Sequence, residues 1–276
     1  MRVQCVVMIG IVLLLPSISS AGDTPWDVKL PFKEAVVTYE LGGVESGQET
    51  LYIKDYGEKT ARYRTTSSMV LGITQTVNSV EIVTPEWIYT FDLQEGTGTK
   101  SVNPQKLMIE EYRKLTPEEK IRVDANGENM AGALRSGLHG SVEPDARTVL
   151  GYSCDRITGM GTIAYSIHNS GITLLSESNI MGVKISRTAV ALETRGVDDS
   201  FFEFPNGIVP QPSPVKDQVA ALIARQTIGV LKGSEGVKAG SQGTVGILPA
   251  EGPAIPEEDQ LQMQEAMKTI KGLFGN

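Results

Sequence analysis

The sequence predicts an α+β protein in which helices cover one face of a curved antiparallel sheet. Two observations lead to this prediction. Residues 32–102, and again residues after 148, alternate apolar and polar side chains with a period of two, which is typical of strands with one solvated face. Between these two regions, residues 104–136 carry apolar side chains at helical spacing. About eight to ten strands around one helical insert give an α+β layout.

The first strands are predicted from short alternating segments separated by turn residues. Residues 32–41 place one set of side chains on a single face: Ala35, Val37, Tyr39 and Leu41. Residues 47–55 and 59–70 flank Tyr56 and Gly57, which indicates a hairpin. Two further strands are expected over residues 77–102, with the turn between them at Pro85 and Glu86 and a bend at residues 96–98.

The helical insert has clear start signals. Asn103 and Thr116 are both candidate N-caps followed by proline, and Thr116 with Glu119 forms a capping box. A loop is predicted after the insert, and strands resume at Thr148. They include a hairpin over residues 162–178 that turns at residues 169–171, and two more strands at residues 182–194 and 200–208. A helix over residues 211–232 is predicted to have an apolar stripe formed by Val219, Leu222, Ile223 and Val230.

The N-terminus predicts export. Residues 1–21 combine Arg2, an apolar run of about ten residues and small residues up to Ala21, which is the order of a secretory signal peptide. The run is shorter than the roughly 20 residues of a membrane span. Cleavage after Ala21 is therefore expected, with an uncleaved anchor as the alternative. The remaining protein is expected not to be integral to a membrane.

The composition limits the partners of the exported chain. The formal net charge of −8 disfavours nucleic acid, whose phosphates require a basic face, and disfavours docking on an anionic membrane. Of the two cysteines, only Cys154 remains after cleavage, so no internal disulfide is possible. Residues 22–232 are predicted to form the folded domain and to draw their stability from an apolar core.

The C-terminal region predicts a tethered helix. Residues 233–256 are rich in glycine and proline, as in a flexible linker. Residues 257–276 are predicted to form an amphipathic helix whose apolar face, a candidate partner-binding surface, consists of Met263, Met267, Ile270 and Phe274. The helix has three possible docking surfaces: its own sheet, another protein or a membrane.

The residue types needed for catalysis are scarce. Cys154 lies in a predicted strand beside Asp155, and three roles are weighed for it: a buried packing residue, a redox-sensitive or intermolecular thiol, and a catalytic nucleophile. Neither His139 nor His168 has a diagnostic spacing to it. The sequence has no CxxC, HxxxH, HExxH, GxGxxG or GxSxG motif. We therefore expect no enzymatic activity, no cofactor and no metal site.

Residues 47–102 resemble a known family. The strand "GQETLYI" is followed by the aromatic and arginine-bearing strand "ARYRTT" and by the hairpin "VEIVTPEWIYTFD". This order is similar to that of the periplasmic lipoprotein carrier and its outer-membrane receptor, the lipoprotein-localisation superfamily. The stretch "TVLGYSC" at residues 148–154 also resembles related bacterial envelope proteins of unassigned function. The resemblance implies an unclosed β-barrel lidded by helices around an apolar cavity for acyl chains, in the periplasm of a Gram-negative bacterium.

The sequence thus predicts an exported, non-enzymatic protein that binds a lipid or lipidated partner in an apolar cavity between sheet and helices. The alternative is an envelope protein–protein interaction module with a solid core and a partner-binding C-terminal helix. The candidate lining residues of the cavity are apolar or aromatic side chains of the predicted strands: Val37, Tyr39, Leu51, Ile53, Tyr63, Trp87, Tyr89, Ile163, Tyr165 and Ile167.

Overall fold

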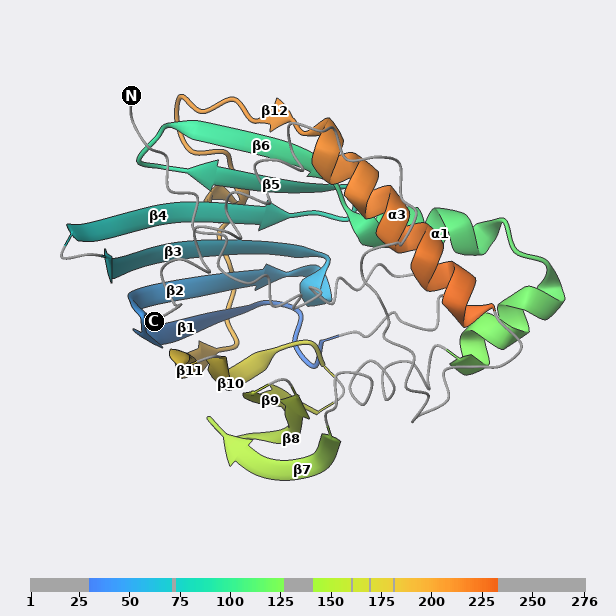
Figure 1. The fold of residues 1–276 in the computed structure, drawn as a ribbon, viewed down its shortest axis with the longest axis horizontal. Coiled ribbons are helices and arrows are strands. Elements are labelled where there is room, and N and C mark those ends of the chain that lie inside the picture. Colours follow the sequence, from blue (N-terminus) through green and yellow to red (C-terminus); the bar gives the residue numbers. More distant parts are fainter. Residues whose placement is uncertain are drawn as a thin grey trace, which may run out of the picture. The chain divides into compact units, whose positions relative to one another are not determined.

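The computed structural model describes residues 30–70, 73–126, 141–159, 161–168, 170–180 and 182–232 (Figure 1). The chain divides into two compact units, Met1–Ala239 and Gly240–Asn276, and every described residue belongs to the first. The predicted signal peptide, the linker, the C-terminal helix with Met263, Met267, Ile270 and Phe274, and His139 lie outside the described residues.

The described strands form one twelve-stranded sheet. They are β1 (Ala35–Gly43), β2 (Glu45–Lys54), β3 (Lys59–Val70), β4 (Ile73–Val83), β5 (Trp87–Asp92), β6 (Thr97–Val102), β7 (Ser141–Val149), β8 (Tyr152–Gly159), β9 (Thr162–Ile167), β10 (Thr173–Ile180), β11 (Val183–Glu193) and β12 (Gln211–Pro212). Their order is β12-β6-β5-β4-β3-β2-β1-β11-β10-β9-β8-β7. The two outermost strands, β12 and β7, are not neighbours, so the sheet is not closed.

Short hairpins build most of this sheet. Strands β1 to β6 pair in sequence, as do β7 to β11, and all these pairs are antiparallel. The pairing of β1 with β11 joins the two halves, and β12 adds a short parallel pair to β6. Gly43, the last residue of β1 before the turn into β2, has φ +106°, and a Cβ there would lie 2.0 Å from the Lys184 carbonyl oxygen. This turn therefore requires glycine.

The predicted α+β class with a curved, open sheet is confirmed. Figure 1 shows the sheet curling most strongly at β7, β8 and β9. The predicted hairpin at Tyr56 and Gly57 is present as the short 3-10 turn η1 (Asp55–Gly57) between β2 and β3. Among the described residues, no helix is both long enough and apolar enough to cross a membrane.

Three details of the strand prediction were wrong. Residues 87–102 are a hairpin of β5 and β6 rather than one bent strand, because the Asp92 carboxylate accepts the Gln94 and Glu95 amides and folds the chain back. The segment before Thr148 was expected to be a loop, but it contributes the edge strand β7. The two-residue strand β12 was not expected. The described sheet therefore has twelve strands, whereas eight to ten were predicted.

Residues 200–208 were predicted to be a strand and are not. They begin in the 3-10 helix η2 (Asp199–Phe202), whose first turn is capped by the Asp198 carboxylate accepting the Ser200 amide at 2.8 Å. The alternation of phenylalanines that suggested a strand instead packs Phe201, Phe202 and Phe204 on aromatic side chains of the sheet.

The helices begin where their caps predicted. In α1 (Pro104–Arg113), the Asn103 side chain accepts the Gln105 amide at 3.0 Å. Before the helical residues 117–126, the Thr116 hydroxyl accepts the Glu119 amide at 3.2 Å and the Glu119 carboxylate accepts the Thr116 amide at 3.0 Å. The remainder of the predicted insert, residues 127–136, lies outside the described residues.

The third helix, α3 (Pro214–Leu231), buries a different face from the predicted one. Its buried residues are Ala220, Ala224, Ile228 and Leu231, whereas Val219 and Val230 of the predicted stripe are about half exposed. Ile228 and Leu231 pack with Tyr112 and Val123 in a small core between the three helices. The small alanines permit this close packing, which a count of large apolar residues overlooks. Near the start of α3, the Asp217 carboxylate accepts the Val102 amide at 2.7 Å and ties the helix to β6.

Candidate functional site

Strand alternation gives β1, β2 and β3 two chemically different faces. The register pairs Val37 with Leu51 and Tyr39 with Glu49, so these four side chains share one side of the sheet, here called the Tyr39 face. Tyr63 pairs with Thr50 and lies on the opposite side, here called the Tyr63 face.

The Tyr39 face carries an apolar cluster that spans both halves of the sheet. It consists of Leu30, Phe32, Ala35, Val37, Tyr39, Leu51, Ile53, Cys154, Ile167, Ile172, Leu174 and Ala189. Residues from β8, β9 and β10 thus meet residues of β1 and β2, which requires the sheet to curve over this face.

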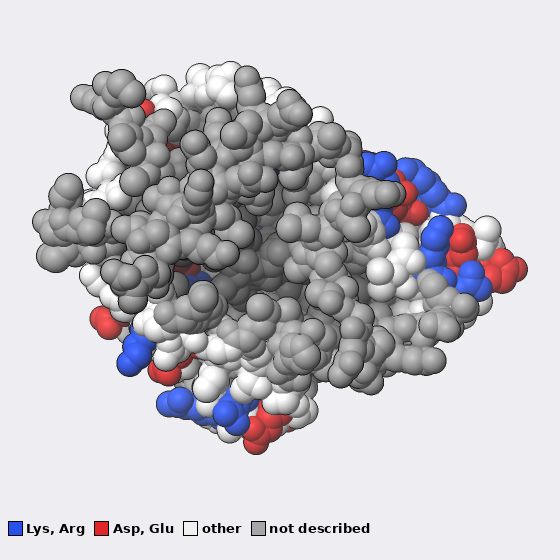
Figure 2. Space-filling model, viewed as in Figure 1, with Lys and Arg blue, Asp and Glu red and all other residues white. Residues whose placement is uncertain are grey.

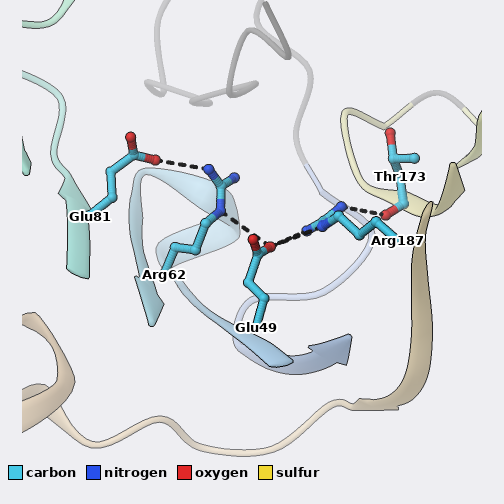
Figure 3. A network of polar contacts seen from close by, with 5 residues as sticks. All are labelled: Glu49, Arg62, Glu81, Thr173 and Arg187. Carbon is cyan, nitrogen blue, oxygen red and sulfur yellow. Dashed lines mark hydrogen bonds and ion pairs between the residues drawn. The ribbon is translucent and has the colours of Figure 1, made fainter. Parts of the chain in front are cut away.

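A network of charged side chains borders this apolar cluster on the same face (Figure 3). Glu49 is the centre of the network. Its Oε1 atom accepts from Arg187 Nη2 at 2.6 Å and from Arg187 Nε at 2.9 Å, and lies 3.4 Å from Arg62 Nε. Arg62 Nη1 donates to Glu81 at 3.0 Å, and Arg187 Nη1 donates to the Thr173 carbonyl oxygen at 3.2 Å.

The network includes strongly desolvated groups. The Glu49 side chain is 5 % exposed and that of Arg187 is 14 % exposed, whereas that of Arg62 is 33 % exposed. Burial disfavours the Arg62 charge, but the Glu49 and Glu81 carboxylates outweigh this effect and raise the pKa of the guanidinium. Because desolvation offsets most of the attraction within a buried ion pair, such a network adds little net stability compared with apolar packing. Its presence on this face therefore suggests a role other than stabilising the fold.

Tyr39 lies where the network meets the apolar cluster. The Arg187 guanidinium stacks on its ring, with the central carbon 3.4 Å from the ring centroid. Burial is the main cause that raises the pKa of the Tyr39 phenol, and the Glu49 charge adds to it, while Arg187 and Arg62 oppose it. The phenol thus remains protonated at neutral pH and can donate a hydrogen bond.

The structure divides the predicted lining residues between the two faces. Val37, Tyr39, Leu51 and Ile53 lie on the Tyr39 face, and Ile167 and Tyr165 of β9 pack in or against its apolar cluster. Ile163 lies two residues before Tyr165 in β9 and is partly buried. Tyr63, Trp87 and Tyr89 lie on the Tyr63 face. The ten residues therefore do not all surround one space.

The Tyr63 face is largely covered by the chain's own aromatic residues. Phe201 stacks on Tyr52 with ring centroids 3.8 Å apart, and the Tyr63 hydroxyl donates to the Phe201 carbonyl oxygen at 3.0 Å. Phe204 contacts Tyr89 at 4.7 Å between ring centroids. A pocket of about 230 Å³ remains beside this segment, lined by Tyr63, Val80, Leu93, Ser200, Glu203, Phe204, Pro205 and Asn206.

Sequence reasoning missed the charged network. The sequence patterns assigned no role to Glu49, Arg62 or Arg187. A signal was present, because Glu49 shares its side of β2 with Leu51 and Ile53, so the alternation that predicts an apolar face also places a carboxylate on it. The partner Arg187 lies 138 residues away in the sequence, and no local pattern connects the two.

Cys154 is fully buried in the apolar cluster. Burial is the main cause that raises the pKa of its thiol, and the Asp155 charge adds to the effect. The thiol is consequently protonated at neutral pH, which fits the packing role weighed for it.

One cluster of potential metal ligands was also not expected from the sequence. Asp145, Asp155 and His168 each place a ligand atom within 4.8 Å of the others. His168 Nδ1 lies 2.7 Å from Asp155 Oδ1 and 3.9 Å from Asp145 Oδ1. The Asp155 carboxylate also accepts the Asp145 amide at 3.1 Å. These polar contacts account for the close approach of the three side chains.

Comparisons with known proteins give no family. No protein-family model and no curated protein matches the chain. An uncharacterized conserved protein from Thermus thermophilus aligns with a TM-score of 0.39 and 8 % identity over 65 % of this chain and 91 % of that one. A structure of PNGF-II aligns with a TM-score of 0.34 and 12 % identity over 72 % of this chain, which spans about a third of that protein (33 %). At such TM-scores, these likenesses establish neither a common fold nor a function.

Proposed function

We propose that this protein is exported to the periplasm of a Gram-negative bacterium and binds, without catalysis, a lipid or lipidated partner on the Tyr39 face. The observation that carries the proposal is the layout of this face, where an apolar cluster across both halves of the sheet ends at a charged network. A molecule with an acyl chain and a polar end has the same two-part character.

The energetics of acyl-chain binding suit an apolar cluster of this kind. Each buried methylene contributes about 0.8 kcal/mol without needing a polar partner. Because β7 and β12 do not pair, the sheet can change its curvature without breaking hydrogen bonds between its two outer strands. Such a change would let an acyl chain reach the apolar cluster. The signal-like residues 1–21 and the resemblance of residues 47–102 to the lipoprotein-localisation superfamily point the same way.

The distribution of charged side chains on the surface favours ligand binding through apolar contacts. Where described residues reach the surface in Figure 2, Lys and Arg are interspersed with Asp and Glu near the helices and near β7 to β9. Among the described residues on this face, both signs of charge therefore lie side by side and do not form a basic patch of the kind that would hold an anionic membrane or a nucleic acid.

Two measurements test the proposal. Protein purified gently from the periplasm should carry lipid in native mass spectrometry, and a photoactivatable fatty acid should label peptides of β1, β2 and β9. Labelling confined to residues 197–208 would move the site to the Tyr63 face. Absence of both co-purified lipid and photolabelling would overturn the proposal.

The alternative function is an envelope interaction module. The exposed side chains Val215, Val219 and Val230 of α3, between 50 % and 67 % exposed, favour a protein contact there. Deletion of residues 233–276, which include the predicted partner-binding helix, separates the two functions. Lipid binding should survive this deletion under the first proposal, whereas a co-purifying protein should be lost under the second.

A further inference from the structure

The Tyr39 face holds buried hydrogen-bond donors that lack an acceptor. Among the described residues, five side chains have a buried polar atom without a hydrogen-bond partner: Tyr39, Arg62, Arg64, Asn78 and Arg156. Three of these atoms can donate and lie on the Tyr39 face, namely Tyr39 Oη, Arg62 Nε and Arg64 Nε. The Arg187 guanidinium approaches the Tyr39 phenol as a donor, so the phenol proton still has no acceptor. Arg62 Nε lies 3.4 Å from Glu49 Oε1 as an ion pair but makes no hydrogen bond to it. Buried polar groups are nearly always paired, so this concentration suggests a partner that supplies acceptors.

The register confirms that the three donors are neighbours. Tyr39 pairs with Glu49, and Glu49 pairs with Arg64 on the next strand. Arg62 is two residues from Arg64 and lies on the same side of β3. Arg62 and Arg64 have side chains 33 % and 38 % exposed, so this edge of the network is open to an incoming group.

The charges on this face are already balanced. Arg62 pairs with Glu81, Arg64 with Glu45 and Arg187 with Glu49. An added carboxylate or phosphate would bring an unbalanced negative charge next to three buried or partly buried carboxylates. A neutral acceptor meets the surplus of donors without that cost.

We propose that Tyr39 Oη and Arg62 Nε donate hydrogen bonds to the carbonyl oxygens of an ester-linked acyl ligand. Esters offer acceptors and no donors, and their chains continue into apolar surroundings, which matches Tyr39 standing between the network and the apolar cluster. This inference rests on the proposed function, because it assigns the polar end of the ligand whose chain occupies the Tyr39 face.

The test compares two lipids that differ only in their carbonyl groups. 1,2-Dioleoylglycerol and its dialkyl ether analogue, which lacks the carbonyls, are each titrated against a bound acyl-chain fluorophore. Wild-type protein should prefer the ester by about five- to tenfold, because a buried donor left without an acceptor is costly. Tyr39→Phe should reduce the preference by about threefold or more, because it weakens binding of the ester more than binding of the ether.

Two further variants make the comparison specific. Tyr63→Phe removes a phenol hydroxyl from the opposite face and should keep the wild-type preference for the ester. Arg62→Lys keeps the positive charge beside Glu81 but removes the Nε donor, and should also lower the preference for the ester. It tests the inference independently if Tyr39→Phe does not fold. Thermal melts establish that each variant is folded.

The outcomes separate this inference from the proposed function. Equal binding of ester and ether by wild-type protein, with both displacing the fluorophore, overturns the inference and leaves acyl-chain binding intact. An ester preference that persists in both Tyr39→Phe and Arg62→Lys also overturns it. If neither lipid displaces the fluorophore, the proposed function itself is overturned.

Discussion

At the scale of single residues, the most informative position is Glu49. It occupies an inward position in a strand whose neighbours on that side, Leu51 and Ile53, are apolar. Two arginines from different strands satisfy its charge, so its burial depends on both of them. The folded state depends on this carboxylate, because removing it would leave the Arg187 and Arg62 guanidinium groups without their partner where little water reaches them.

Glu49→Ala should therefore destabilise the protein by about 3 kcal/mol, since breaking a buried ion pair strands the remaining charge. The matched control is Glu45→Ala, whose partner Arg64 is more exposed, and it should cost about 1 kcal/mol or less. Urea unfolding of both variants measures the difference. Equal losses would mean that the network at Glu49 is no more desolvated than an ordinary surface pair.

Cys154 gives a second residue-scale prediction. Because burial raises its pKa and removes access, alkylation by iodoacetamide at pH 7 should be at least about a hundredfold slower in folded protein than in urea. Mass spectrometry of quenched samples gives both rates. Rapid labelling of the folded protein would restore the hypothesis of a reactive thiol.

At the scale of elements, the capping box of residues 116–119 shows how local chemistry fixes a helix start. Hydrogen bonds in both directions join Thr116 and Glu119, as the sequence predicted. The bond from the Thr116 backbone amide is the main cause that lowers the pKa of Glu119. The charged carboxylate is thus the form that stabilises the helix.

The pH dependence follows from the direction of this shift. Since the pKa is lower in the folded state, the stabilisation from Glu119 is present above the unfolded pKa and is lost as the pH falls through the folded pKa. Hydrogen exchange of residues 117–126 should therefore speed up under acid conditions in wild-type protein, once corrected for intrinsic rates. Glu119→Gln should remove most of this acid sensitivity; an unchanged profile would contradict the role of the carboxylate.

Thr116→Ala tests the other half of the box at neutral pH. Loss of an N-cap side chain costs about 1 kcal/mol, and thermal unfolding should show a loss of that size. Ser213→Ala is a suitable comparison, because Ser213 is the N-cap residue of α3 and makes no side-chain capping hydrogen bond. A comparable loss in both variants would show that the capping bonds are not the cause.

At the scale of the whole molecule, the open sheet distinguishes this fold from a closed barrel. Among the described strands, β12 and β7 each pair on one side only. Strand β7 carries Pro144, Asp145 and a register shift, which discourage pairing with another chain. The sheet therefore remains open without inviting edge-to-edge association, and changes of curvature stay available to it.

Export is the prediction that concerns the chain as a whole. If residues 1–21 direct secretion, the intact mass of protein recovered from the periplasm should correspond to a chain beginning at Gly22. Recovery of the full-length chain in the membrane fraction would instead support the uncleaved anchor.

The sequence by itself determined the local features. The hairpin at Tyr56, the caps at Asn103 and Thr116, and the strand around Cys154 follow from turn chemistry, capping and alternation, all of which depend on residues close together in the chain. The α+β class follows from the same patterns. Its errors were also local, as at residues 200–208, where alternating phenylalanines belong to a covering segment rather than a strand.

Only the tertiary structure decided which residues share a face. The β1–β11 pairing brings Arg187 to Glu49, and the register separates Tyr39 from Tyr63, although both were predicted to line one cavity. A shift of one residue in register would exchange these faces, and alternation along a single strand cannot fix its register with a distant one. The network and its unpaired donors therefore arise from long-range pairing, which local sequence patterns do not encode.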